Sequence, residues 1–104
     1  MTINPGICKV VKLLNDNGFT TCDSGDGVTH DYACDRDAPY VCITVAPLSL
    51  CLECIRLVGV MRACGITIKP IGPHDDPCIQ GTYDPANDIA TIELMGVNDS
   101  MLSI

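Results

Sequence analysis

The segment of residues 47–64 constrains the fold most, because it is almost wholly apolar and has residues that favour a helix start and a helix end at its two boundaries. It begins with a proline, which suits the first turn of a helix, and Gly65 follows it, which suits the position after the last turn. Its polar side chains are few, and Ser49, Glu53 and Arg56 form a narrow stripe. Such a helix buries more than one face. We expect one face in the core and another against a second subunit, so the chain is predicted to form a homo-oligomer.

The segments around this helix indicate β-strands. Residues 40–46 are rich in β-branched side chains, and neither alternating face is strongly polar, which predicts a central strand. Residues 79–84 and 89–95 flank a short Pro-Ala-Asn-Asp connection and read as a β-hairpin. In the second of these strands the alternation predicts that Ala90, Ile92 and Leu94 face the core and that Thr91, Glu93 and Met95 face outward. Shorter strand candidates are residues 19–22 and residues 66–70, of which the second could be a plain connection.

A second helix is predicted near the N-terminus. Asn4 is a good N-cap residue, and the proline that follows it suits the first helical position. Apolar side chains then recur at helical spacing up to Leu14, and Gly18 suits the C-terminal end. At the other end of the chain, residues 97–104 end with apolar side chains. This segment is expected either to fray or to dock onto a partner subunit.

The chain of 104 residues is long enough for one core and too short for two, so residues 1–104 are predicted to form a single domain. The order of elements is αββαββ, with one more strand if residues 66–70 pair. We therefore expect an α+β fold: a two-layer sandwich with two helices on one face of a mainly antiparallel sheet of four to five strands.

The charge balance limits the partners. Thirteen acidic and six basic residues give a net charge of −7, without a basic run or a basic helix face. Such a surface does not attract duplex nucleic acid or an anionic membrane. A small molecule or a basic host protein fits this charge. No apolar run reaches the ~18 residues of a membrane span and no secretory signal is evident, so a cytoplasmic location is predicted.

Eight cysteines are unusual for such a chain, and five of them lie inside apolar, periodic segments. For a cytoplasmic protein, buried free thiols that act as small hydrophobic groups are the favoured interpretation over a disulfide framework. Cys51 and Cys54 form a CxxC pair, but no second pair follows at zinc-site spacing, and their neighbours are apolar. Core packing is favoured over redox chemistry here.

The most polar stretch lies at residues 22–35, between two apolar segments. It combines glycines, whose backbone can approach a ligand closely, with hydroxyl, carboxylate and imidazole side chains. Successive N–H groups in such a turn can hold a phosphate or carboxylate, and an aspartate can hold sugar hydroxyls. The candidate ligand-binding residues are Asp23, Ser24, Gly25, Asp26, Gly27, Thr29, His30 and Asp31.

Two other interpretations of this stretch stay open. Its aspartates could bind a hard metal ion, although their spacing does not match a calcium loop. They could also form Asx turns that merely connect two strands. Seventeen residues separate Cys22 from Tyr40, and long connections of this kind are often functional. This length favours a ligand-binding loop, and the metal question stays open.

Catalytic motifs are not evident. The sequence has no nucleophile elbow, phosphate-loop lysine or dinucleotide fingerprint, and we predict no catalytic residue and no cofactor. His74 and Asp75 form a second polar cluster; if it met His30 and Asp31, the four side chains would suit a metal. A solvated loop is the favoured interpretation of that cluster. A metal-dependent hydrolase is kept as an alternative function.

Three stretches, LLNDNGFTTCDSGDGVTHDY, APYVCITV and YDPANDIATIELMG, resemble small uncharacterised proteins of bacteriophages and prophages with a DSGDG-type loop. In such a protein the final turn would carry a glycine, where this chain has Asn87 and Asp88. The resemblance implies a phage context, in the cytosol of the host cell, without a defined activity. By analogy it suggests a non-enzymatic anti-defence factor that sequesters a small phosphorylated or nucleotide ligand. An inhibitor of a host protein is the alternative.

Overall fold

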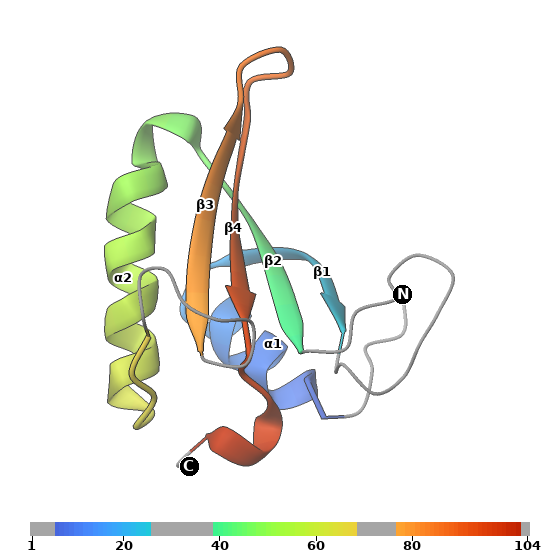
Figure 1. Cartoon of the computed structure of the whole chain (residues 1–104), viewed down its shortest axis with the longest axis vertical. Coiled ribbons are helices and arrows are strands. Elements are labelled where there is room, and N and C mark those ends of the chain that lie inside the picture. Colours follow the sequence, from blue (N-terminus) through green and yellow to red (C-terminus); the bar gives the residue numbers. More distant parts are fainter. Residues whose placement is uncertain (1–5, 26–38, 69–76, 103–104) are drawn as a thin grey trace.

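A computed structural model describes residues 6–25, 39–68 and 77–102 of the chain. Two 3-10 turns, Pro47–Ser49 and Asp99–Met101, accompany its helices and strands. The helices and strands are α1 (Cys8–Asp16), β1 (Thr20–Gly25), β2 (Tyr40–Val45), α2 (Leu50–Ala63), β3 (Cys78–Asp84) and β4 (Ile89–Met95). This is the αββαββ order that the sequence predicts, and the fold is α+β (Figure 1).

The four strands form one antiparallel sheet in the order β1-β2-β4-β3. The prediction that residues 40–46 form a central strand is confirmed, because β2 pairs with β1 on one side and with β4 on the other. β3 and β4 form the predicted hairpin, whose turn extends beyond the rest of the sheet in Figure 1. β1 and β3 are the two edge strands.

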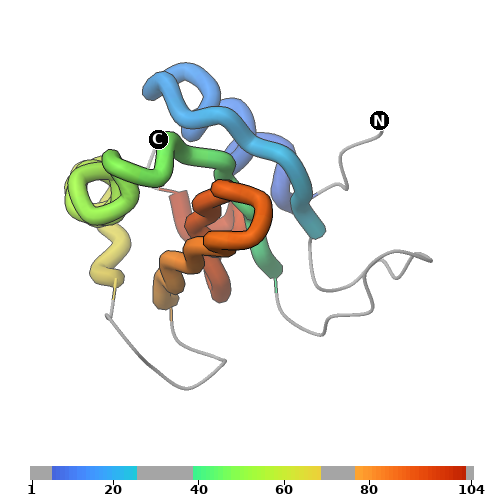
Figure 2. The backbone as a smooth tube through the Cα atoms, turned by 90° about the horizontal axis from the view of Figure 1, so that it is seen from above, coloured from blue at the N-terminus to red at the C-terminus, as the bar shows by residue number. Residues whose placement is uncertain are grey.

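Both helices pack on the same face of the sheet, which we call the core face. Val41 and Ile43 of β2 lie opposite Leu94 and Ile92 of β4, and all four are buried in one cluster with side chains from both helices. α1 packs against β1, whereas α2 runs alongside β3 at the other edge (Figures 1 and 2). The other face of the sheet, which neither helix covers, is called the open face below.

The start of the first helix differs from the prediction. α1 begins at Cys8 with Ile7 at the N-cap position, rather than at Asn4, which lies outside the described residues. Ile7 has no side chain that could accept a hydrogen bond, and the cap comes from elsewhere. Asp99 of the C-terminal 3-10 turn accepts a hydrogen bond from the backbone N–H of Val10 at 3.0 Å. The helix therefore begins where a distant carboxylate can satisfy its first turn.

The C-terminal segment docks onto its own domain rather than fraying. Val97 is buried in the core, and Met101 and Leu102 pack against it. The backbone N–H of Asp99 also donates to the carbonyl oxygen of Gly6 at 2.8 Å. The segment thus covers the start of α1 in the same chain. The apolar ending of the sequence, which favours fraying or docking onto a partner subunit, does not indicate this arrangement.

The candidate strand at residues 66–70 is not a strand in its described part. Ile66 and Ile68 are buried, but neither pairs with a strand of the sheet. They follow α2 after Gly65, which has a φ of 84° and ends the helix. Within the described ranges, no helix is long and apolar enough to cross a membrane.

Candidate functional site

The structure places three of the eight predicted ligand residues. Asp23, Ser24 and Gly25 are not in a loop, because β1 continues to Gly25 instead of ending at Cys22. The other five, Asp26, Gly27, Thr29, His30 and Asp31, lie outside the described residues. His74 and Asp75, the second predicted His-Asp pair, also lie outside them.

A β-bulge in β1 decides which way Asp23 points. Thr21 pairs with Ile43, but the next paired residue is Asp23 opposite Cys42, so Cys22 is the extra residue of the bulge. Side chains alternate between the faces of a sheet, and one inserted residue moves every later side chain to the other face. Without the bulge, the Asp23 side chain would point to the core face. With it, the carboxylate stands on the open face.

Both oxygens of the Asp23 carboxylate are held by neighbours. Oδ1 accepts a hydrogen bond from the backbone N–H of Ser24 at 2.9 Å. Oδ2 accepts one from the hydroxyl of Tyr40 at 3.3 Å. The Tyr40 side chain is almost fully buried, so its hydroxyl is a fixed donor. An ionised carboxylate has about four acceptor positions, which leaves Asp23 with acceptor capacity toward solvent.

Asp23 belongs to a polar row that crosses the whole sheet. It lies opposite Cys42 of β2, which lies opposite Glu93 of β4, which in turn lies opposite Gln80 of β3. The thiol of Cys42 donates to Oε2 of Glu93 at 3.8 Å. The open face therefore carries two carboxylates, a thiol and an amide in one register. We call Asp23, Cys42, Glu93 and Gln80 the acidic row.

A second row beside it is made of hydroxyl groups. It comprises one threonine from each strand, in register: Thr20, Thr44, Thr91 and Thr82. Three of them are exposed, and Thr91 is partly so. Threonine suits a strand because of its branched side chain, and on this face it presents a donor and an acceptor to solvent. The open face thus offers hydrogen bonds across its full width.

Gly25 has a structural role that the sequence interpretation missed. It lies opposite Tyr40 in the ladder, and the ring covers it so closely that a Cβ at Gly25 would stand 2.6 Å from Cε1. Gly25 is not among the glycines with a positive φ. The missing side chain of Gly25, in the edge strand β1, therefore makes room for the ring of Tyr40 in the neighbouring strand β2, rather than for a ligand.

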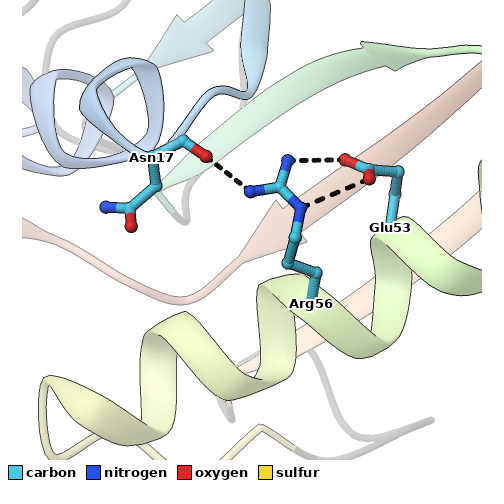
Figure 3. A network of polar contacts seen from close by, with 3 residues as sticks. All are labelled: Asn17, Glu53 and Arg56. Carbon is cyan, nitrogen blue, oxygen red and sulfur yellow. Dashed lines mark hydrogen bonds and ion pairs between the residues drawn. The ribbon is translucent and has the colours of Figure 1, made fainter.

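Arg56 of α2 makes several polar contacts that have a structural role. Its guanidinium lies 3.8 Å from the centre of the Phe19 ring. It also donates to both carboxylate oxygens of Glu53 and to the carbonyl oxygen of Asn17 (Figure 3). The hydrogen bond to Glu53 is the main reason that the pKa of Arg56 is raised above the ordinary value for arginine. These contacts join α2 to the turn between α1 and β1.

Cys54 of the CxxC pair does not have the environment of a reactive thiol. Burial, and after it the nearby Cys51 and Glu53, raise the pKa of the Cys54 thiol, which disfavours the thiolate. Cys22, Cys51, Cys54 and Cys64 are free thiols. Residues 6–25, 39–68 and 77–102 hold no group of three His, Cys, Asp or Glu side chains that could bind a metal ion.

The sequence interpretation missed Tyr40 and Glu93 as parts of the site. The alternation along residues 89–95 did place Glu93 on the outer face of its strand. The position of Glu93 in the same row as Asp23 depends on the bulge and on the strand order, and no local sequence pattern indicates either. Comparison with known proteins finds no family model, no curated protein and no solved structure that matches this chain.

Proposed function

We propose that this chain is a non-enzymatic binding protein that captures a small phosphorylated or nucleotide ligand on the open face of the sheet. The ligand would lie where β1 leads into residues 26–31. The observation that supports this most is the bulge that turns Asp23 to the open face, into one row with Glu93. A bulge that re-aims a side chain is common beside functional sites.

The acidic row suits the sugar of a nucleotide. Carboxylates accept hydrogen bonds from ribose hydroxyls in dinucleotide-binding proteins. Asp23 is oriented for this role, because Tyr40 and Ser24 hold its two oxygens in place. The phosphate would be bound by backbone N–H groups, hydroxyls and the imidazole of residues 26–31, as the sequence predicts.

Binding is favoured over catalysis by the spacing of the carboxylates. Asp23 and Glu93 stand on β1 and β4, with β2 between them. Neighbouring strands lie about 4.8 Å apart, so the two strands are separated by about 10 Å. Asp23 is exposed and Glu93 is partly exposed, so neither carboxylate lies in an enclosed cavity that would exclude water from a reaction.

The biological setting is part of the proposal. A small acidic phage protein that removes a nucleotide signal from the cytosol of its host would act as an anti-defence factor. This follows from the resemblance to phage proteins and from the ligand class, and it requires stoichiometric binding instead of turnover.

The proposal is tested by thermal shift and titration calorimetry with a panel of linear and cyclic nucleotides. We expect at least one to stabilise the protein, and Asp23→Asn to weaken that ligand tenfold or more. The matched control is Asp16→Asn, which removes one carboxylate from the exposed end of α1. If no nucleotide stabilises the protein, or if Asp23→Asn binds like the unchanged chain, the proposal is wrong.

The net charge of −7 favours a second candidate, an inhibitor that covers a basic surface of a host protein. It predicts that one host protein binds stoichiometrically and is released by salt, with Asp26→Asn and His30→Ala having no effect. The first candidate predicts that these two changes abolish nucleotide binding. The two functions are therefore separated by the same pair of variants.

A further inference from the structure

The outer side of α2, together with the 3-10 turn that precedes it, carries an exposed apolar stripe that no part of the described chain covers. Leu48 is fully exposed, and Leu52 and Ile55 are each 69% exposed. Within α2, Leu52, Ile55 and Gly59 recur at steps of three and four residues, and Leu48 precedes them in the 3-10 turn Pro47–Ser49. This spacing is that of the seam between two packed helices. We call Leu48, Leu52, Ile55 and Gly59 the outer stripe.

The outer stripe is separate from the side of α2 that packs in the core. Leu57 and Met61 of the same helix have no exposed surface, and they fill the space above the sheet. The helix is therefore apolar on two opposite sides, as the sequence predicts. Burial of the inner side is complete without the outer stripe, which leaves the outer side available for a contact with another molecule.

The stripe has a projection at one end and a notch at the other. Leu48 borders an open hollow of about 580 Å³, which Tyr83 and Asp88 of the hairpin also line. A Cβ at Gly59 would meet nothing within 4 Å, so the surface there is indented to the helix backbone. One end of the stripe thus offers a large side chain, and the other end offers room for one.

We propose that a second copy of this chain covers the outer stripe, with the two α2 helices antiparallel about a two-fold axis. In this arrangement Leu48 enters the notch at Gly59 of the second copy, and Leu52 packs against Ile55 of the second copy. A two-fold interface repeats each contact. A parallel pair would instead set Leu48 against Leu48 and leave both notches empty.

The charges at the two ends select the same arrangement. Arg62 is exposed at the C-terminal end of α2, and in the ranges that the structure describes it makes no ion pair. Asp88 lines the hollow at the other end, where one of its oxygens accepts from the Tyr83 hydroxyl at 2.8 Å. An antiparallel pair brings Arg62 of each copy to Asp88 of the other, whereas a parallel pair sets Arg62 against Arg62.

The size of the contact sets its strength. α2 has 14 residues, and a helix of this length is about 21 Å long. A single pair of such helices buries an area at the lower end of specific interfaces, which is typical of weak, reversible complexes. Two copies that each carry a net charge of −7 also repel each other. We therefore expect a reversible dimer, with a dissociation constant on the order of micromolar.

The test is sedimentation velocity of the full chain over a range of concentrations, with a reducing agent because Cys51 is exposed. We expect a monomer–dimer equilibrium, and Leu52→Glu is expected to yield a monomer at every concentration. The matched control is Lys9→Gln on α1, which lowers the net charge by the same one unit and is expected to dimerise normally. A chain that stays monomeric at about 300 μM, or a dimer that survives Leu52→Glu, would overturn the proposal.

Two further variants test the geometry and guard against misfolding. Gly59→Leu fills the notch, so it is expected to weaken the dimer tenfold or more while the monomer becomes no less stable. Arg62→Glu and Asp88→Arg are each expected to weaken the dimer, and their combination is expected to restore it. Normal dimerisation of Gly59→Leu, or no restoration in the double variant, would exclude the antiparallel pairing. The outer stripe lies on the outer side of α2, whereas Asp23 lies on the open face of the sheet. The dimer test therefore gives its result whether or not the protein binds a nucleotide.

Discussion

The carboxylate of Asp99 accepts a hydrogen bond from the backbone N–H of Val10, 89 residues earlier in the chain (3.0 Å). The N-cap residue of α1, Ile7, makes no side-chain capping bond, so this contact satisfies a donor of the first helical turn from outside the helix. A negative charge at this place also interacts favourably with the helix dipole. The 3-10 turn Asp99–Met101 therefore stabilises the start of α1.

Asp99→Ala is expected to destabilise the fold by about 1–2 kcal/mol, which is the cost of losing a helix cap. Asp99→Asn keeps an acceptor oxygen and is expected to lose less than half of that. Both are measured by urea denaturation followed by circular dichroism. Equal losses for the two variants would show that the charge, and not the hydrogen bond, is what stabilises α1.

Arg56→Ala is expected to destabilise the fold by about 1–2 kcal/mol, because it removes the contact with the Phe19 ring and the hydrogen bond to Asn17. Arg56→Lys should recover only part of this, because an ammonium lacks the planar fork of the guanidinium. The comparison variant is Lys12→Ala, which breaks an exposed ion pair with Asp16 and should cost less than about 0.5 kcal/mol. A loss for Arg56→Ala as small as that of Lys12→Ala would contradict this role.

Gly25→Ala is expected to destabilise the fold by about 1–3 kcal/mol, since its Cβ would overlap the Tyr40 ring. In a Tyr40→Leu background the same substitution should cost much less, because the ring that it overlaps is gone. A double-mutant cycle in denaturant measures this coupling. Gly59→Ala in the Leu52→Glu background is the opposite control: it meets open space on a helix and should stabilise by about 1 kcal/mol. A cycle without coupling would refute the close contact.

Asn87→Ala is expected to raise the pKa of Asp84 toward the ordinary value for aspartate. The side chain of Asn87 donates to Asp84 at 2.8 Å and is the main reason that the pKa of Asp84 is lowered, with backbone N–H groups adding to it. A lowered folded pKa means that the ionised form stabilises the hairpin turn above the unfolded pKa of about 3.9. That stabilisation is lost as the pH falls through the folded pKa.

The pKa of Asp84 is measured by following its carboxyl carbon in NMR titrations. Asn17→Ala serves as the control, because it removes a side-chain amide that bonds to Leu13 at the end of α1, beside the opposite edge of the sheet. We expect that variant to leave the pKa of Asp84 unchanged. An unchanged value in Asn87→Ala would show that the backbone N–H groups alone lower it.

Much of the candidate site was beyond prediction from the sequence. The polar stretch at residues 22–35 marked Asp23 as a ligand residue, and the alternation in residues 89–95 marked Glu93 as outward-facing. Nothing local relates the two, because their register depends on the bulge at Cys22 and on β2 lying between β1 and β4. The sequence likewise predicts that Gly25 binds a ligand, whereas its structural role is to make room for Tyr40. Tyr40 is fifteen positions away in the sequence, so no local pattern indicates this contact.

The sequence by itself determined the kinds of elements and their order. Helical spacing before Gly18 and after Pro47, and β-branched alternation in residues 40–46 and 89–95, are local signals that short-range sterics and burial impose. Tertiary structure alone decided the start of α1, the face on which Asp23 stands and the side of α2 left exposed. Each of these depends on contacts between residues far apart in the chain, and such contacts form only when the packed core fixes which surfaces meet.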